Sequence, residues 1–186
     1  MKKNDHDFEV TPDLNFENVV YQEGKKVYNL AYRLCGNSEE AKDIVQETFM
    51  KAYENFHRFQ GKSQVFTYLY RITFNIWKNR IRYKNRHPIF SLQHNGPEEK
   101  AFDPPDPAPP PDKILETEEK SSLIKKCLGS LEPAERLIIV MRDIEGKSYE
   151  EITRVLNCRL GTVKSRLARA RGNLREILSP HLKILK

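Results

Sequence analysis

Cysteine is scarce in this chain: only Cys35, Cys127 and Cys158 occur among 186 residues, and they lie far apart. No pair has the Cys-x-x-Cys spacing of a structural zinc site, and the five histidines are scattered. An odd number of cysteines also disfavours a disulfide framework. We therefore expect no metal and no cofactor, with the thiols acting as small apolar side chains in a reducing compartment.

Long apolar runs are absent as well. A membrane-spanning helix needs about 20 mostly apolar residues, whereas 31% of this chain is charged and its mean hydropathy is −0.70. The N-terminus is polar and acidic, with Asp5, Asp7 and Glu9 behind two lysines, which does not fit a secretory signal. The sequence predicts a cytoplasmic protein without membrane insertion.

Signatures of enzyme chemistry are also missing. The chain has no glycine-rich phosphate loop and no nucleophile motif, and His57 is better explained as a surface or boundary residue than as a catalytic base. We expect a protein that is not an enzyme, and an enzyme remains only a weak alternative.

Charge is strongly segregated along the chain, although the net charge is only +6. Residues 61–90 carry seven basic side chains and no acid, and residues 157–186 carry eight basic side chains and one acid. Residues 91–120 reverse this balance, with eight acids and three lysines. Two separate basic surfaces indicate contact with a polyanion at two places, the alternative being two solvated helix faces.

Proline divides the chain, since eight of its eleven prolines lie between Pro88 and Pro111. Proline lacks a backbone donor, so this acidic stretch predicts an extended tether instead of a helix or an inner strand. Helical periodicity is strong on both sides of it. We predict an all-α fold with two small helical domains, 14–87 and 113–180, joined by a linker over 88–112, each domain having a modest core.

Caps and apolar spacing predict seven helices. Asn37 or Ser38 starts the second helix, Pro133 the fifth and Ser148 the sixth, while Asn157 ends the sixth in a left-handed conformation. The expected helices are 14–35, 38–56, 64–86, 113–129, 133–143, 148–156 and 160–178.

The last two predicted helices have the layout of a helix-turn-helix. The final helix has one apolar stripe, made of Val163, Leu167, Ala170, Leu174 and Ile177. Its polar side carries Thr162, Lys164, Ser165, Arg166 and Arg169. Such side chains can reach base edges and phosphates in the major groove. The alternative is an ordinary basic helix on the surface of a bundle.

The predicted helix 64–86 mixes aromatic and basic side chains, a composition suited to unpaired bases and their phosphates. A small bundle also needs aromatic side chains for its core. We therefore expect most of them to be buried, with exposure limited to some of Tyr68, Phe74 and Tyr83.

Two ordered sets of motifs resemble a known family. Three runs resemble region 2 of bacterial sigma-70-type factors: Asp43-Ile44-Val45-Gln46-Glu47-Thr48-Phe49, Phe59-Gln60-Gly61 and Thr67-Tyr68-Leu69-Tyr70-Arg71-Ile72-Thr73-Phe74-Asn75. Three further runs resemble region 4 of the same factors: Leu131-Glu132-Pro133-Ala134-Glu135-Arg136, Tyr149-Glu150-Glu151-Ile152 and Gly161-Thr162-Val163-Lys164-Ser165-Arg166-Leu167. The presence of these two regions alone, joined by a linker, is typical of the extracytoplasmic-function (ECF, group 4) sigma factors. In two places the chain departs from the family pattern: Tyr68 replaces the usual Trp and Thr153 the usual Ala.

The resemblance implies that the protein binds core RNA polymerase, directs it to promoters and helps to melt the DNA. Asp43, Gln46 and Glu47 would bind the beta-prime clamp helices. The minus-ten element would be met by Phe59, Gln60, Gly61, Lys62, Ser63, Tyr68, Arg71, Asn75, Lys78, Asn79 and Arg82. The minus-thirty-five element would be met by Arg159, Thr162, Lys164, Ser165, Arg166 and Arg169. Further implied partners are the beta flap of the polymerase and an anti-sigma factor.

A stand-alone DNA-binding repressor or activator is the remaining alternative. It would explain residues 113–180, but it leaves the face formed by residues 43–47, the aromatic helix and the acidic tether without roles. A repressor should bind duplex DNA tightly on its own, usually as a dimer, whereas a sigma factor should bind promoter DNA weakly until polymerase joins it.

Overall fold

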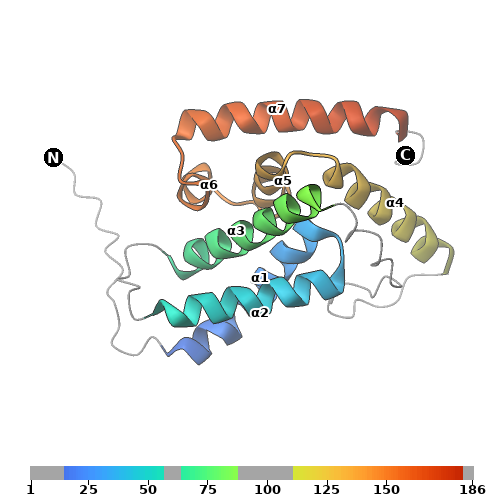
Figure 1. The fold of residues 1–186 in the computed structure, drawn as a ribbon. Helices are drawn as coiled ribbons and strands as arrows, with labels where there is room; N and C mark the ends of the chain where they lie inside the picture. The colour runs from blue at the N-terminus through green and yellow to red at the C-terminus, as the bar shows by residue number, and fades with distance from the viewer. Residues whose placement is uncertain (1–14, 57–63, 88–110, 182–186) are drawn as a thin grey trace.

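The computed structural model describes residues 15–56, 64–87 and 111–181, with side chains from residue 120 onward in the last part. Over these residues the regular structure is entirely helical, which confirms the predicted all-α fold (Figure 1). None of the described helices is long and apolar enough to cross a membrane.

The first half contains three helices, α1 (Phe16–Cys35), α2 (Ser38–Glu54) and α3 (Val65–Arg86), each close to its predicted range. The side-chain oxygen of Asn15 accepts the backbone N–H of Glu17 at 3.0 Å, and that of Asn37 accepts the N–H of Glu40 at 2.9 Å. These bonds satisfy donors that the first helical turn leaves free. Gly36 ends α1 with φ at +77°, a conformation that glycine adopts without steric cost.

The second half contains α4 (Pro111–Gly129), α5 (Pro133–Ile139), η3 (Val140–Ile144), α6 (Tyr149–Leu156), α7 (Leu160–Leu178) and the short η4 (Ser179–His181). Helix α4 starts two residues before the predicted position, because proline is tolerated in a first helical turn, where its missing donor is not needed. The predicted helix 133–143 is regular only as far as Ile139. It then widens into the π-helical turn η3, in which the N–H of Glu145 donates to the carbonyl of Val140 at 3.0 Å.

The caps of α6 follow the prediction. The Ser148 hydroxyl accepts the N–H of Glu151 at 3.1 Å, and the Glu151 carboxylate accepts the N–H of Ser148 at 2.6 Å, so the two residues form a capping box. Asn157 ends the helix in the predicted left-handed conformation, with φ of 49° and ψ of 53°.

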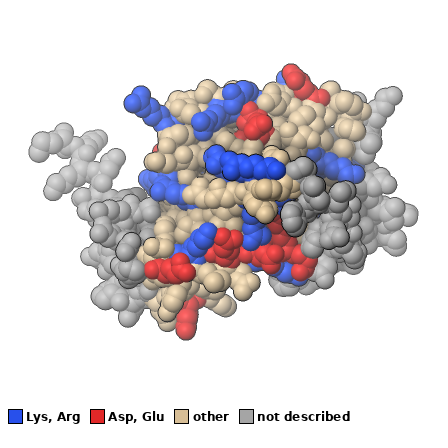
Figure 2. Space-filling model, viewed as in Figure 1, with Lys and Arg blue, Asp and Glu red and all other residues tan. Residues whose placement is uncertain are grey.

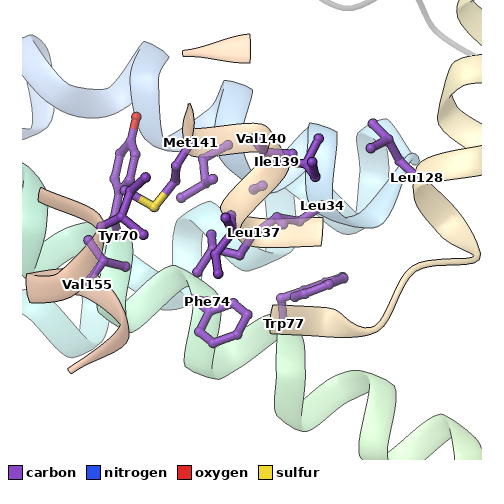
Figure 3. Close-up of a cluster of buried hydrophobic side chains, with 14 of the residues drawn as sticks. Leu34, Tyr70, Phe74, Trp77, Leu128, Leu137, Ile139, Val140, Met141 and Val155 are labelled. Carbon is purple, nitrogen blue, oxygen red and sulfur yellow. The ribbon is translucent and has the colours of Figure 1, made fainter. Parts of the chain in front are cut away.

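The buried side chains of the two halves form one continuous cluster, whereas the sequence suggested a separate modest core for each domain. Tyr70, Phe74 and Trp77 of α3 face Leu137 and Met141 of the second half (Figure 3). Helix α6 packs on α3, and α4 packs on α1. The two halves therefore share a core in this arrangement.

The aromatic side chains of α3 agree with the expectation that only some of the three candidates are exposed. Only 5% of Phe74 is accessible, because it lies against the second half of the chain. The other two candidates are more accessible: Tyr83 is exposed and Tyr68 is half-buried.

Candidate nucleic-acid and partner-binding surfaces

The outward face of α2 carries the residues that were predicted to contact polymerase. Asp43 and Gln46 are exposed, and Glu47 is half-buried. Positions separated by three and four residues lie on one side of a helix, so the three side chains share this face. Ile44 and Thr48, on the other side, are fully buried and hold the helix against the bundle.

An arginine from α3 also belongs to this face. Arg80 Nη2 donates to Glu47 Oε2 at 3.0 Å, and its Nη1 lies 4.0 Å from Asp43 Oδ2. Lys51 Nζ donates to the other oxygen of Glu47 at 2.7 Å. The hydrogen bond from Lys51, followed by that from Arg80, lowers the pKa of Glu47 below its usual value, so the carboxylate is charged at neutral pH.

Sequence reasoning missed Arg80 as a member of the α2 face. Its partner Glu47 lies 33 residues away, and no local spacing relates two helices that meet only through tertiary packing. The segregation of charge along the chain was the one signal in the sequence that pointed to such a pair. Residues 61–90 hold seven cations and no acid, so their ion-pair partners have to come from another segment.

The outward side of α3 brings together several residues predicted to meet the minus-ten element. Asn75, Asn79 and Arg82, spaced by four and three residues, are all exposed. Lys78 is half-buried, with its Nζ 5.8 Å from the centre of the Phe74 ring. Tyr68 is half-buried, and burial raises the pKa of its hydroxyl. The remaining predicted loop residues, Phe59, Gln60, Gly61, Lys62 and Ser63, lie outside the described residues.

Arg71 is exposed on the same helix but already has a partner in the second half of the chain. Its guanidinium donates to the backbone carbonyl of Arg154, near the end of α6. A residue predicted to contact DNA therefore holds the two halves together in this arrangement.

Helices α6 and α7 form the predicted helix-turn-helix. Lys164 and Ser165 are exposed in the first half of α7, while Thr162 and Arg166 are half-buried and Arg159 is exposed at the N-cap. Val163, Leu167 and Ala170 are buried along the opposite stripe, as the spacing predicted. In Figure 2, several basic side chains lie along the upper edge, where α7 runs, together with acidic side chains toward its right end, while basic and acidic side chains alternate lower in the view, where α2 and α3 run.

Arg169 differs from its neighbours on α7. Its Nε donates to the carboxylate of Glu135 at 2.7 Å, and Asn173 Nδ2 donates to the other oxygen at 3.0 Å. Glu135 is only 3% exposed, so these two bonds satisfy a buried charge within the second half. Arg169 thus has a structural partner that the sequence pattern did not indicate, besides its predicted role in DNA reading.

The two departures from the family pattern are accommodated. Thr153 is half-buried, and its hydroxyl donates to the carbonyl of Glu150 at 2.7 Å, while Ile152 and Val155 still pack inward. Tyr68 packs on the smaller cluster formed by Val19, Val27, Ala52 and Leu69.

Among the described residues, no group of three His, Cys, Asp or Glu side chains could hold a metal ion.

Comparisons with known proteins bear on these surfaces. The model of sigma-70 region 2 matches residues 20–87, and the model of sigma-70 region 4 matches residues 121–174. RNA polymerase sigma-H factor of Pseudomonas aeruginosa is 33% identical over 172 residues, which are 90% of this chain and 88% of that protein. The chain belongs to the sigma-70 family.

Other sigma factors support the same assignment. ECF RNA polymerase sigma factor SigE of Mycolicibacterium smegmatis is 35% identical over 167 residues, and the chain spans 63% of the length of that relative. ECF RNA polymerase sigma-E factor of Escherichia coli is 33% identical over 168 residues, which are 89% of this chain and 87% of that protein. The chain is thus an ECF member of the family.

Two solved structures have a similar fold. One is the sigma factor RpoE of Bartonella quintana in complex with the anti-sigma factor NepR, with 26% identity and a TM-score of 0.63 over 88% of this chain and 96% of that chain. The other is CnrH in complex with the cytosolic domain of CnrY, with 22% identity and a TM-score of 0.64 over 89% of this chain and 88% of that chain, a similarity of fold alone.

Proposed function

We propose that this ECF sigma factor binds core RNA polymerase through the outward face of α2, recognises promoter DNA through α3 and α7, and promotes melting of the minus-ten element. The observation that supports this best is the exposure of Asp43 and Gln46 on α2 beside the exposed amides and cation of α3. The region 2 domain thus presents an acidic face on α2 and a basic face on α3, which can bind two different partners.

The chemistry of the α2 face suits a partner helix rich in basic side chains. The exposed carboxylate of Asp43 and the exposed amide of Gln46 can accept hydrogen bonds from arginine and lysine, and the half-buried carboxylate of Glu47 adds a second negative charge to the face. We propose the beta-prime clamp helices as that partner. The beta flap remains a predicted partner with no residue assigned to it.

The two basic surfaces suit DNA in two different states. We propose that the outward side of α3, with Asn75, Asn79 and Arg82, follows the melted minus-ten strand, because amides and cations can contact its bases and phosphates. Helix α7, with Lys164 and Ser165 exposed in its first turns, would enter the major groove at the minus-thirty-five element. Transcription itself is chemistry of the polymerase, so the sigma factor needs no catalytic residue.

We also propose an anti-sigma factor as an inhibitory partner, because the similar sigma factor of B. quintana was crystallised with one. The cytoplasm is the proposed compartment, since RNA polymerase and promoter DNA are there.

The first experiment is co-elution of the purified chain with core RNA polymerase. We expect the wild-type chain to co-elute, and the triple variant Asp43→Ala, Gln46→Ala, Glu47→Ala to co-elute much less. A control variant, Glu17→Ala and Gln22→Ala, removes one acid and one amide from exposed positions of α1, one acid fewer than the triple variant, and should bind like the wild type. A folded wild-type chain that does not co-elute would favour the stand-alone DNA-binding protein, which duplex binding by the chain alone would then test.

A further inference from the structure

Glu135 is a buried carboxylate that binds an arginine on the polar side of α7. It lies in the first turn of α5, and α5 packs on α7 (Figure 1). The side chain of Glu135 is 3% exposed, whereas that of its partner Arg169 is 66% exposed. The pair thus has one end fixed in the protein interior and the other end at the surface that the proposed function assigns to DNA.

The hydrogen bonds of this cluster leave the far edge of the Arg169 guanidinium available. Glu135 Oε1 accepts the Nε–H of Arg169 at 2.7 Å, while Glu135 Oε2 accepts the side-chain amide of Asn173 at 3.0 Å. Four of the five N–H donors of a guanidinium are on its two terminal nitrogens. Neither terminal nitrogen of Arg169 donates to another of the described residues. Arginine uses two donors of this kind to pair with O6 and N7 of guanine.

Arg171, two residues farther along α7, is held in a different way. Its Nε and Nη2 donate to the two oxygens of Asp143, at 3.1 and 2.5 Å. This side-on pairing occupies both carboxylate oxygens and one terminal nitrogen of the guanidinium. Asn173 excludes the same pairing for Arg169, because it already occupies the second oxygen of Glu135. Both terminal nitrogens of Arg169 therefore remain available for a ligand.

Arg169 also lies on the side of α7 that was predicted to enter the major groove. It follows Ser165 by four residues and Thr162 by seven, so the three side chains share one side of the helix. Ser165 and Arg169 are both exposed. An arginine loses much rotamer freedom when it is immobilised on a ligand, and a bond that already fixes its Nε reduces this loss. Anchored in this way, Arg169 is preorganised for binding.

We propose that Glu135 is a positioning residue for promoter recognition: together with Asn173, it orients Arg169 so that both terminal nitrogens can pair with a guanine edge in the minus-thirty-five element. This inference rests on the proposed function, in which α7 enters the major groove at that element. A well-placed bidentate arginine discriminates between base pairs by about 5- to 150-fold. Part of this discrimination should depend on Glu135, although its buried carboxylate does not contact the DNA.

The test uses holoenzyme assembled from core RNA polymerase and the full-length chain. A promoter that the wild-type holoenzyme selects from random DNA is varied one base pair at a time across its minus-thirty-five element, and relative affinities are measured by competition. Arg169→Ala identifies the base pairs that Arg169 reads. At those base pairs, we expect Glu135→Ala and Asn173→Ala each to lower discrimination about fivefold. Glu135→Ala releases Arg169, whereas Asn173→Ala allows it to pair side-on with both oxygens of Glu135.

Two further variants separate positioning from a purely structural contribution. Glu135→Gln keeps an oxygen that can accept the Nε–H of Arg169, so it should retain most of the discrimination. The double variant Glu135→Ala, Arg169→Ala should discriminate no worse than Arg169→Ala, because Glu135 acts through Arg169. Thermal melting shows which variants are folded. Asn173→Ala leaves the buried carboxylate paired with Arg169, so it tests the proposal even if Glu135→Ala folds poorly.

A matched control removes an acid that pairs with an arginine of α7 outside this cluster. Asp143→Ala should change the affinity for all sequences by the same factor and leave the base preferences as they are, because a change of charge alone carries no sequence information.

Several results would overturn the proposal. Unchanged base preferences in both Glu135→Ala and Asn173→Ala would do so, as would losses at base pairs that Arg169 does not read, or an equal loss in Glu135→Gln and Glu135→Ala. If Arg169→Ala altered no base preference, Arg169 would not read the element and the inference would fail with that role. A wild-type holoenzyme that selected no promoter would instead contradict the proposed function itself.

Discussion

At the scale of single residues, Arg136 shows how one side chain can serve several elements. It is 9% exposed, and its guanidinium donates to the carbonyls of Leu34 in α1 and Gly129 in α4. Its Cζ lies 5.1 Å from the centre of the Trp77 ring of α3. Planar stacking together with a fork of donors is a geometry that lysine cannot reproduce.

We therefore predict that Arg136→Lys lowers the free energy of unfolding by about 1–3 kcal/mol, because it leaves buried carbonyls without donors. Urea denaturation followed by circular dichroism measures the change. Arg175→Lys, at an exposed position of α7, serves as the control and should have little effect. Equal stability of the two variants would show that the three contacts of Arg136 contribute nothing net.

Cys35 gives a second prediction at this scale. Burial raises the pKa of its thiol to about 11, and the thiol donates to the carbonyl of Asn37 at 3.1 Å. Because the thiolate is the reactive form, Cys35 should be alkylated by iodoacetamide at pH 8 about 100-fold more slowly than an unperturbed thiol. Mass spectrometry of timed samples measures the rate at this site, with a short unstructured cysteine peptide as reference. A Cys35 rate matching that of the peptide would contradict the burial of the thiol.

At the scale of elements, sequence patterns predicted most of the helices because their signals are local. Asn37 and Ser148 cap α2 and α6 through hydrogen bonds to residues three positions away, and the stripe of α7 follows from helical periodicity alone. The π-helical turn of η3 was not predicted. It places Glu145 and Lys147 against α3, a requirement set by the other half of the chain and therefore invisible in local spacing.

The turn between α6 and α7 provides a prediction about an element. Asn157 has φ of 49°, a conformation that costs an alanine about 1–2 kcal/mol. Asn157→Ala should therefore lower the melting temperature, whereas Asn157→Gly should leave it equal or slightly higher. Differential scanning calorimetry of the two variants measures the contrast. Similar losses in both variants would mean that the asparagine side chain matters at this position more than its backbone conformation.

At the scale of the whole molecule, the packing of the two halves of the chain on each other should make stability depend on pH. Burial raises the pKa of Glu145, while the hydrogen bond from Tyr70 and the charges of Arg33 and Lys147 partly offset that effect. A folded-state pKa above the usual value of about 4.3 means that the folded chain binds more protons than the unfolded chain in this window. The contribution of Glu145 to stability is then lost as pH rises through its folded-state pKa.

We predict that Glu145→Gln, which keeps an acceptor for Tyr70 without the buried charge, removes this part of the pH dependence. The melting temperature of the variant, relative to that of the wild type, should rise as the pH increases above about 4.3, the usual pKa of a glutamate. Thermal scans at several pH values measure the difference, with Asp143→Asn as a variant of equal charge. A difference that stays constant across the range would show that Glu145 titrates as an ordinary exposed glutamate.

The sequence by itself determined the helices, their caps, the segregation of charge and the two sets of family motifs, because each depends on residues close together in the chain. It also predicted which sides of α2, α3 and α7 point outward. Only the tertiary structure decided which side chains pair with one another across these surfaces. Arg80 joins the acidic face of α2, Arg169 pairs with buried Glu135, and Glu145 meets Tyr70 across the two halves. Such pairs form between residues 33 to 75 positions apart, where packing, and not local spacing, selects the partner.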